Sequence, residues 1–356
     1  MNPTIKKLLM PVYSRCPPRI QQQLYEFYHT ALRKPPHRPA QDIILRLQNR
    51  IRTELAPYTA GLNDFALLDF PNYSNVGDSA IWLGEIAYFK DTLNVRPSYI
   101  CTIESFSADA LRQAVPNGPI FLSGGGNFGD MWPVCQAFRE YVLAQFPDRL
   151  VVQLPQTIHF EDKAICARTA AAIKAHGKLI LCVRDRRSLK IAKSSFDCPV
   201  HLVPDMAFCL GAQNKPVMPQ NSILFLLRTD KESTRANPAI YDLGFPLPDS
   251  ALVADWLDEE PGLYERLKAE TGESISQEAL FHKVATHRFW RGARLLSSAS
   301  FVATDRLHSH IMCILLNIHH AVLDNSYGKV SAFVEAWTKD CDLVQMATSL
   351  DVFNLV

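Results

Sequence analysis

The chain has 356 residues, of which 47% are hydrophobic, and a formal net charge of +1. This length supports more than one domain with its own core, and the composition excludes a collagen-like, low-complexity or disordered protein. The charge is uneven, because residues 1–52 carry a net charge of +8 and the remainder carries −7. No stretch of about 20 apolar residues is present, so we expect no membrane-spanning helix.

Residues 1–40 form a basic, proline-punctuated N-terminal arm. Ile5, Leu8 and Leu9 interleave with Lys6 and Lys7, which is typical of a segment lying at a membrane interface. A solvated surface arm is the alternative. Nucleic acid is not expected as a partner, because the arm has no recognisable nucleic-acid motif and the rest of the chain is acidic.

Nine cysteines are scattered without a C-x-x-C pair. Several lie in apolar, strand-like runs, so they are interpreted as buried, reduced thiols of a cytoplasmic protein. The same lack of paired ligand spacing predicts that no metal is bound. If the basic arm contacts a membrane, the protein would be peripheral to its inner face.

Strands and helices alternate after the arm. A helix is predicted over about 41–55. Strands are predicted over 65–70, 119–123, 150–154, 179–183 and 201–204. Helices are predicted over about 79–90, 162–176 and 186–194, and a further helix follows the glycine-rich loop and ends at about residue 145. Repeated β-α units favour a parallel sheet with helices on both faces.

The stretch 211–221 is predicted to be a linker to a second α/β unit. That unit is expected to contain strands at 222–227, 301–304 and 320–324, helical segments over 250–299, and helices from about 306 and 328. The resulting prediction is an α/β protein with two Rossmann-like domains, 41–212 and 213–356, facing a cleft. Ligands of such sheets lie at the carboxyl ends of the strands, where every candidate motif falls.

The segment 72–81 joins the first strand to a helix and carries Asn75, Gly77 and Asp78. Asp78 or Ser79 is predicted to cap the helix, and Gly77 to supply an unusual backbone angle. The loop is interpreted as contacting an acceptor, with a simple capped turn as the alternative.

The segment 124–129 matches G-x-G-x-x-G after a strand, which by itself suggests a dinucleotide site. The next strand ends without the acidic residue that would hold a ribose, so NAD and FAD are rejected. Gly125 and Asn127 are instead expected where a ligand or a facing loop approaches the backbone closely. A structural tight turn is the rival interpretation.

Three further candidates follow strand ends in the first half: His159, Arg184 and Asp205. His159 is interpreted as a proton carrier or as a structural histidine. Arg184 is expected to hold a carboxylate or phosphate, or else to pair with Asp185, which caps the next helix. A loop contact and a capping role are both open for Asp205.

The second half contributes anion-binding candidates at its own strand ends. Arg228 follows the first strand, although its charge run is equally consistent with a solvated surface. Arg306 and His308 begin a helix after a strand, where free N–H groups and the helix dipole favour anions. Asn325 and Lys329 begin the next helix and are candidates for phosphate binding.

Six motifs, taken in their order along the chain, resemble those of the polysaccharide pyruvyltransferase family. They are Asn-Tyr-Ser-Asn-Val-Gly-Asp-Ser-Ala-Ile at 72–81, Gly-Gly-Gly-Asn-Phe-Gly-Asp at 124–130, Leu-Pro-Gln-Thr-Ile-His-Phe at 154–160, Val-Arg-Asp at 183–185, Pro-Asp-Met-Ala-Phe at 204–208 and Asp-Arg-Leu-His-Ser-His-Ile at 305–311. The segment around 323–330 is similar as well. The resemblance covers about 65–335 and leaves the arm outside.

The resemblance implies a glycosyltransferase-B-like fold that uses phosphoenolpyruvate as co-substrate and needs no cofactor. The acceptor would be a sugar of an exopolysaccharide or other cell-surface glycan precursor, in some cases lipid-linked, and the product a pyruvate ketal. Arg306, His308 and His159 would be catalytic, with either histidine as the acid, and Arg184 would bind the donor. A nucleotide-sugar glycosyltransferase and a non-catalytic glycan-binding protein are the alternatives.

Overall fold

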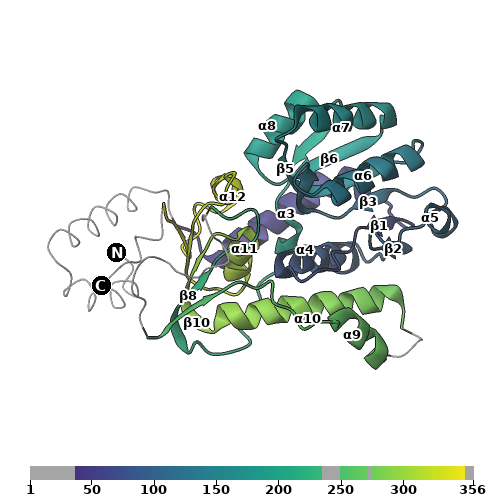
Figure 1. Ribbon diagram of the computed structural model, residues 1–356. Helices are drawn as coiled ribbons and strands as arrows, with labels where there is room; N and C mark the ends of the chain where they lie inside the picture. Colours follow the sequence, from purple (N-terminus) through teal and green to yellow (C-terminus); the bar gives the residue numbers. More distant parts are fainter. Residues whose placement is uncertain (1–36, 235–248, 272–274, 349–356) are drawn as a thin grey trace.

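A computed structural model describes residues 37–234, 249–271 and 275–348, which contain two parallel sheets (Figure 1). The first sheet has the order β2-β1-β3-β5-β6-β7, and β4 pairs with β5 off this path. Its strands are β1 (Ala66–Leu68), β2 (Tyr99–Cys101), β3 (Ile120–Leu122), β4 (Gly125–Gly129), β5 (Val151–His159), β6 (Leu179–Val183) and β7 (Val200–Leu202).

The second sheet has the order β12-β11-β10-β8-β9, again with every pair parallel. Its strands are β8 (Asn221–Leu226), β9 (Ala251–Ala254), β10 (Ala299–Thr304), β11 (His320–Val322) and β12 (Val344–Met346). The central strands are short apolar runs, as expected for parallel strands covered on both faces.

Both sheets reverse their strand order at an equivalent place. In the first sheet the chain builds β2 on one side of β1 and β3 on the other, and in the second it builds β9 and β10 on opposite sides of β8. This is the flavodoxin-like doubly wound order, not the Rossmann order with its first strand third in the sheet. Loops that follow the strands on either side of such a reversal diverge and leave a crevice. A ligand is therefore expected at the carboxyl ends of β1 and β3 in the first sheet and of β8 and β10 in the second.

Helices cover the sheets on both faces (Figure 1). They are α3 (Ala40–Thr59), α4 (Val76–Ala87), α5 (Ala108–Ala114), α6 (Pro133–Gln145), α7 (Lys163–His176), α8 (Arg186–Ser195), α9 (Leu263–Thr271), α10 (Gln277–Ser297), α11 (Leu307–Leu315) and α12 (Lys329–Trp337), with a π-helical turn at Tyr88–Thr92 and a 3₁₀ turn at Met206–Leu210. The linker predicted over 211–221 is irregular chain up to the start of β8.

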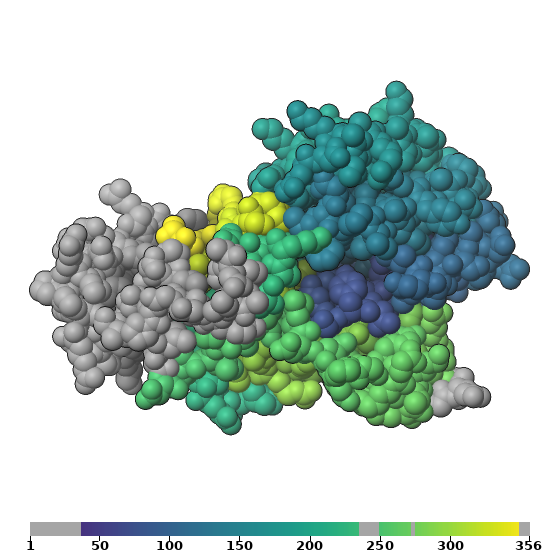
Figure 2. All heavy atoms as spheres, viewed as in Figure 1, coloured from purple at the N-terminus to yellow at the C-terminus, as the bar shows by residue number. Residues whose placement is uncertain are grey.

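The helices that pack between the two sheets share one hydrophobic core. Phe70, which follows β1, stacks on Phe281 of α10 with ring centroids 4.0 Å apart. Val76 of α4 lies against Gly292 of α10, and the buried residues of α4, α10 and α11 belong to one cluster. Figure 2 shows the surface of the first sheet's half, in teal and blue, above the green surface of α9 and α10. This packing fixes the two strand edges relative to each other.

The start of the described chain is tied to its end. Arg38 forms an ion pair with Asp340 at 3.2 Å, and Arg46 of α3 donates to the same carboxylate at 3.0 and 3.1 Å. The remainder of the predicted basic arm, residues 1–36, lies outside the described residues. Within the described chain, no helix combines the length and the apolar character needed to cross a bilayer.

The structure corrects several sequence predictions. Residues 251–254 form β9, not helix; this four-residue strand lies at a sheet edge, where its burial is only partial. The glycine-rich stretch forms β4 instead of a loop. The sequence analysis also missed β2 and β12, which are three-residue strands without a strong periodic pattern. The domain boundaries and the glycosyltransferase-B-like arrangement remain predictions.

Candidate active site

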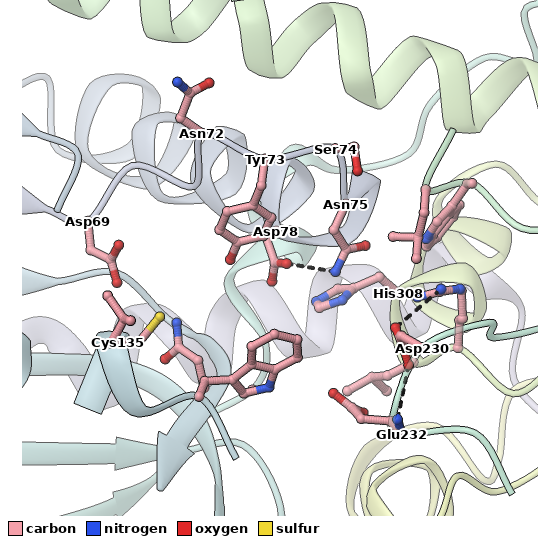
Figure 3. Close-up of a pocket in the computed structure, with 18 of the residues that line it drawn as sticks. Asp69, Asn72, Tyr73, Ser74, Asn75, Asp78, Cys135, Asp230, Glu232 and His308 are labelled. Atoms are coloured by element: carbon pink, nitrogen blue, oxygen red, sulfur yellow. Dashed lines mark hydrogen bonds and ion pairs between the residues drawn. The ribbon is translucent and has the colours of Figure 1, made fainter. Parts of the chain in front are cut away.

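A pocket of about 410 Å³ lies where the carboxyl ends of the two sheets meet (Figure 3). Asp69 follows β1 and Gly126 lies in β4 after β3, while Arg228 follows β8 and Arg306 follows β10. The pocket therefore opens at the strand reversals of both sheets, as the topology predicts. Its volume suits a small ligand together with part of a second one.

One side of the pocket carries Arg184, Arg228, Arg306, His308 and Lys329, which we call the cationic wall, together with the carboxylates of Asp230 and Glu232 that pair with its cations. Arg184 follows β6 and is 1% exposed. Its Nε donates to Thr157 at 2.9 Å and its Nη1 donates to Asp205 at 2.6 Å. Burial opposes ionisation of Asp205, yet the pKa of this carboxyl stays well below its usual value because His308 and Arg184 outweigh burial.

His308 lies in the first turn of α11, and its Nε2 is 3.3 Å from Asp205 Oδ2 and 3.4 Å from Arg184 Nη1. The side chain of Arg306, at the N-cap of α11, makes no cap hydrogen bond with the first N–H groups of this helix, whose first turn lines the pocket. The guanidinium of Arg306 instead binds Asp255, which follows β9, through bonds of 2.6 and 2.5 Å. Two arginines are thus held rigidly around the histidine.

Lys329 and Arg228 share a buried carboxylate, Glu232. Arg228 lies 3.1 Å from it, and Lys329 Nζ donates to it. Burial lowers the pKa of Lys329 to about 8, with Glu232 partly offsetting the effect. Burial also opposes ionisation of Glu232, but Lys329 and Arg228 hold its pKa at about 2. Asn325 donates to Glu232 at 3.1 Å and accepts from the Lys329 backbone, so it positions this cluster.

Two glycines have steric reasons to be glycine. Gly77 is helical, so the unusual backbone angle predicted for it is wrong. A Cβ at Gly77 would meet the His308 ring, at 2.5 Å from Cγ, so only glycine lets the histidine sit there. A Cβ at Gly126 would lie 3.0 Å from Arg184 Nη2 and 3.5 Å from Lys329 Nζ. Gly126 therefore leaves open the space between two cationic groups.

The opposite side of the pocket carries the carboxylates of Asp69, Asp78 and Glu104, which we call the acidic wall. Neither Asp78 nor Ser79 caps α4, so this prediction is wrong. The cap is Asn75, whose Oδ1 accepts from Gly77 N, and Asn75 Nδ2 donates to Asp78 at 2.7 Å (Figure 3). Asp69 has a left-handed backbone with φ +72°.

Residues of the second half of the chain brace the loop that carries this wall. Arg288 of α10 donates to Pro71 O at 3.1 Å, and Arg291 donates to Ser74 O. Glu259 accepts from both arginines, at 2.7 and 2.8 Å. The 71–74 loop is therefore positioned by α10 and not by its own sequence.

The structure brings most of the sequence-predicted residues to one place. Arg184, Arg228, Arg306, His308, Lys329, Asn75, Asp78 and Asn127 line the pocket. Asp205 lies directly behind Arg184 and His308, and Gly125, with φ +140°, lies beside Asp78.

Asp205 and Gly125 adjoin the pocket without lining it, and two further predicted residues lie outside the lining as well. Asn325 lies behind Glu232. His159 ends β5 and stacks on Tyr327 at 4.5 Å, and its Nε2 is 3.4 Å from the exposed Glu161. This stacking and the absence of His159 from the pocket lining favour the structural interpretation of this histidine.

Sequence reasoning missed Asp69, Asp255 and Glu232. Asp69 directly follows an apolar strand, which was a usable signal. Asp255 lies in the segment that was predicted to be helical, so its position after a strand was hidden. Glu232 belongs to a charge run whose alternating signs are typical of a solvated surface, yet it is only 3% exposed. Its burial depends on Arg228 and Lys329, which lie on different elements.

An α/β protein with arginines, a lysine and a histidine gathered at the carboxyl edges of two parallel sheets is equipped to bind a small anion and to move a proton. The family model for polysaccharide pyruvyl transferase matches residues 75–327. The chain belongs to this family, and the membership identifies it as a transferase.

Two relatives support the assignment. Pyruvyl transferase 1 of Schizosaccharomyces pombe is 30% identical over 320 residues, covering 85% of this chain and 77% of the relative. EpsO of Bacillus subtilis, which carries a provisional pyruvyl transferase name, is 32% identical over 281 residues, covering 76% and 84%. A crystal structure of an uncharacterized Klebsiella pneumoniae protein has a TM-score of 0.57 at 16% identity and covers 85% of this chain and 99% of that protein, so it shares the fold.

Proposed function

We propose that this protein transfers pyruvate from phosphoenolpyruvate to two hydroxyls of a sugar in an exopolysaccharide or other cell-surface glycan precursor, forming a pyruvate ketal. The observation that carries the proposal is the cationic wall around His308, in a member of the polysaccharide pyruvyl transferase family. The donor has a carboxylate and a phosphate, and the wall offers matching groups from both sheets.

The donor position is suggested by the groups that remain available. Among the described residues, Arg184 Nη2 has no hydrogen-bond partner, and it faces the space that Gly126 leaves open beside Lys329. The N-terminus of α11 adds N–H groups and the positive end of its dipole. Each cation already has a carboxylate partner, which holds it in place before the donor binds. An anion there would gain charge-assisted hydrogen bonds without the cost of ordering long side chains.

His308 is proposed as the general acid. Protonation of the donor's methylene carbon gives a methyl group and leaves C2 open to attack by a sugar hydroxyl. The second hydroxyl then replaces the phosphate, which leaves with the electron pair of the C2–O bond. Asp205, 3.3 Å from Nε2 of His308, orients the imidazole. His159 is not assigned a step, because it does not line the pocket.

The test is phosphate release from phosphoenolpyruvate with a lipid-linked glycan extract, followed by mass analysis of the glycan. We expect the gain of one pyruvate ketal, and its loss in His308→Gln. His282→Gln, an exposed histidine of α10, is the matched control and should stay active. No release and no mass change across varied extracts, together with thermal stabilisation by UDP- or GDP-sugars, would favour a nucleotide-sugar glycosyltransferase instead.

The basic arm is proposed to hold the enzyme at the inner face of the cytoplasmic membrane, near a lipid-linked acceptor. Its support is the sequence pattern of apolar and basic residues. Deleting residues 1–36 leaves the Arg38–Asp340 pair intact and should release the protein from anionic vesicles in a co-sedimentation assay. Undiminished vesicle binding by the truncated chain would refute the anchoring role.

A further inference from the structure

The two sides of the pocket differ in charge, and this difference separates two kinds of ligand. The cationic wall suits an anion, whereas Asp69, Asp78 and Glu104 would repel one. Carboxylate and amide oxygens accept hydrogen bonds from hydroxyl groups, so the acidic wall suits a neutral polyol. A pocket with both walls can hold an anionic donor and a neutral sugar side by side.

The rim on the acidic side carries exposed apolar groups. Tyr73, Trp132 and Val134 line the pocket, and their exposed fractions are 45%, 36% and 63%; Lys231 lies over one face of the Trp132 ring, 4.0 Å from its centroid. Exposed aromatic side chains that border a polar cleft indicate a binding surface with one apolar and one polar side. A sugar ring has this character, because its C–H faces are apolar and its edge carries hydroxyls.

Asp69 differs from Asp78 in being unengaged, and it differs from Glu104, which also has no side-chain partner in the described chain, in being half-buried instead of exposed. In the part of the chain that the structure describes, no side chain or N–H group forms a hydrogen bond or ion pair with its carboxylate, which points into the cavity (Figure 3). Asp78, by contrast, accepts from Asn75 and lies in the first turn of α4, where the helix dipole stabilises its charge.

The backbone of Asp69 is also unusual. Its φ of +72° is one of three positive values found at described non-glycine residues, and it occurs at the end of β1, beside the strand reversal. Left-handed backbone at a site residue is an outlier that favours a functional role. Here it turns the chain sharply after the strand, so the side chain faces the pocket.

We propose that the acidic wall binds the acceptor sugar and that Asp69 takes the proton from the attacking hydroxyl. This inference rests on the proposed function. The hydroxyl O–H bond breaks as its oxygen bonds to C2, while His308 supplies the proton that converts the methylene to a methyl group. Of the two protons lost by the sugar, one replaces the proton given by His308 and the other leaves with the phosphate.

The surroundings of Asp69 are compatible with this role. The titratable groups near it are Tyr73 of the following loop, Asp78 and Glu85 of α4, Glu104, Cys101 of β2, and Cys135 and Arg139 of α6. Burial raises the pKa of Asp69 to about 6, with Arg139 opposing the rise and Asp78 and Glu104 adding to it. A base with a pKa just below neutrality is ionised at pH 7 and still accepts a proton readily.

The test compares Asp69→Asn with the wild type in the transfer assay. Asparagine also tolerates left-handed backbone, so the turn should be kept. We expect kcat to fall by about 100-fold or more, while the KM for phosphoenolpyruvate and the stabilisation by this donor change by less than about threefold. Asp109→Asn on α5, whose side chain is 90% exposed, is the control for the loss of one charge and should match the wild type.

The pH profile gives a second, independent readout. Wild-type kcat/KM for the acceptor should fall below about pH 6, and Asp69→Asn should lack this limb. A kcat within threefold of wild type, or a wild-type profile without the acidic limb, would overturn the role of Asp69 and leave the proposed function standing. If the wild-type protein itself transfers no pyruvate, both the role of Asp69 and the proposed function are refuted.

Discussion

Replacement of Gly77 by alanine should inactivate the enzyme without unfolding it. In an ordinary helix this change stabilises by about 1 kcal/mol, because alanine has the higher helix propensity. Here the added Cβ would lie 2.5 and 2.6 Å from His308 Cγ and Cβ, where ordinary contact begins at 3.4 Å. The imidazole must therefore retreat by about 1 Å, away from its contacts with Asp205 and Arg184. A misplacement of this size in a reacting group costs about 100-fold in rate.

The assay is kcat/KM for pyruvyl transfer, measured beside the free energy of unfolding. Gly292→Ala is the matched control, because its Cβ would meet Val76, the residue next to Gly77, without touching His308. This control should lose about 1–3 kcal/mol of stability through overpacking and keep its kcat/KM within a few-fold. If Gly77→Ala is folded and keeps kcat/KM within threefold of wild type, the reasoning about His308 is refuted.

Three further predictions concern buried charges. Burial raises the pKa of Glu85 to about 8. The folded state therefore holds a proton that the unfolded chain releases near pH 4.5. The free energy of unfolding should fall by up to about 5 kcal/mol as the pH rises between these two values. Glu85→Gln should flatten this dependence in denaturant unfolding, and parallel curves would contradict the idea. Because the pKa of Lys329 is about 8, wild-type kcat/KM for phosphoenolpyruvate should fall as the pH rises through 8, whereas that of Lys329→Arg should stay level. An equal decline in both proteins would argue against donor binding by the charged form of Lys329. Glu259→Gln should loosen the Arg288–Pro71 and Arg291–Ser74 contacts and raise the acceptor KM several-fold with a smaller change in kcat, and an unchanged KM would show that the brace is dispensable.

The cationic wall illustrates how a site can be both charged and pre-organised. Arg184 and Arg306, which are almost fully buried, are paired with carboxylates from other elements, whereas Arg228 is paired with Asp230 and Glu232 of its own loop. A buried pair contributes little net stability, because desolvation offsets the attraction, but removing one partner leaves a costly unpaired charge. Loss of Asp255 or Asp205 should therefore disturb the site as much as loss of the arginine it holds.

The sequence by itself determined the local structure and the neighbourhood of the site. Apolar runs followed by amphipathic segments identified the main strands and helices, and parallel strands place the residues after them at one edge. That reasoning is sufficient to gather Arg184, Arg228, Arg306 and His308, because each lies within four residues of the carboxyl end of a strand.

Only the tertiary structure decided which groups meet. Arg306 pairs with Asp255, 51 positions away, and Lys329 with Glu232, 97 positions away, and periodicity carries no information about such pairs. The sequence likewise could not predict that Gly77 lies against the His308 ring, or that the carboxylate of Asp69 has no partner among the described residues. Local pattern reports which residues are buried and in which element, whereas contacts between the ends of different strands depend on the order of strands in each sheet and on how the shared core docks the two sheets together.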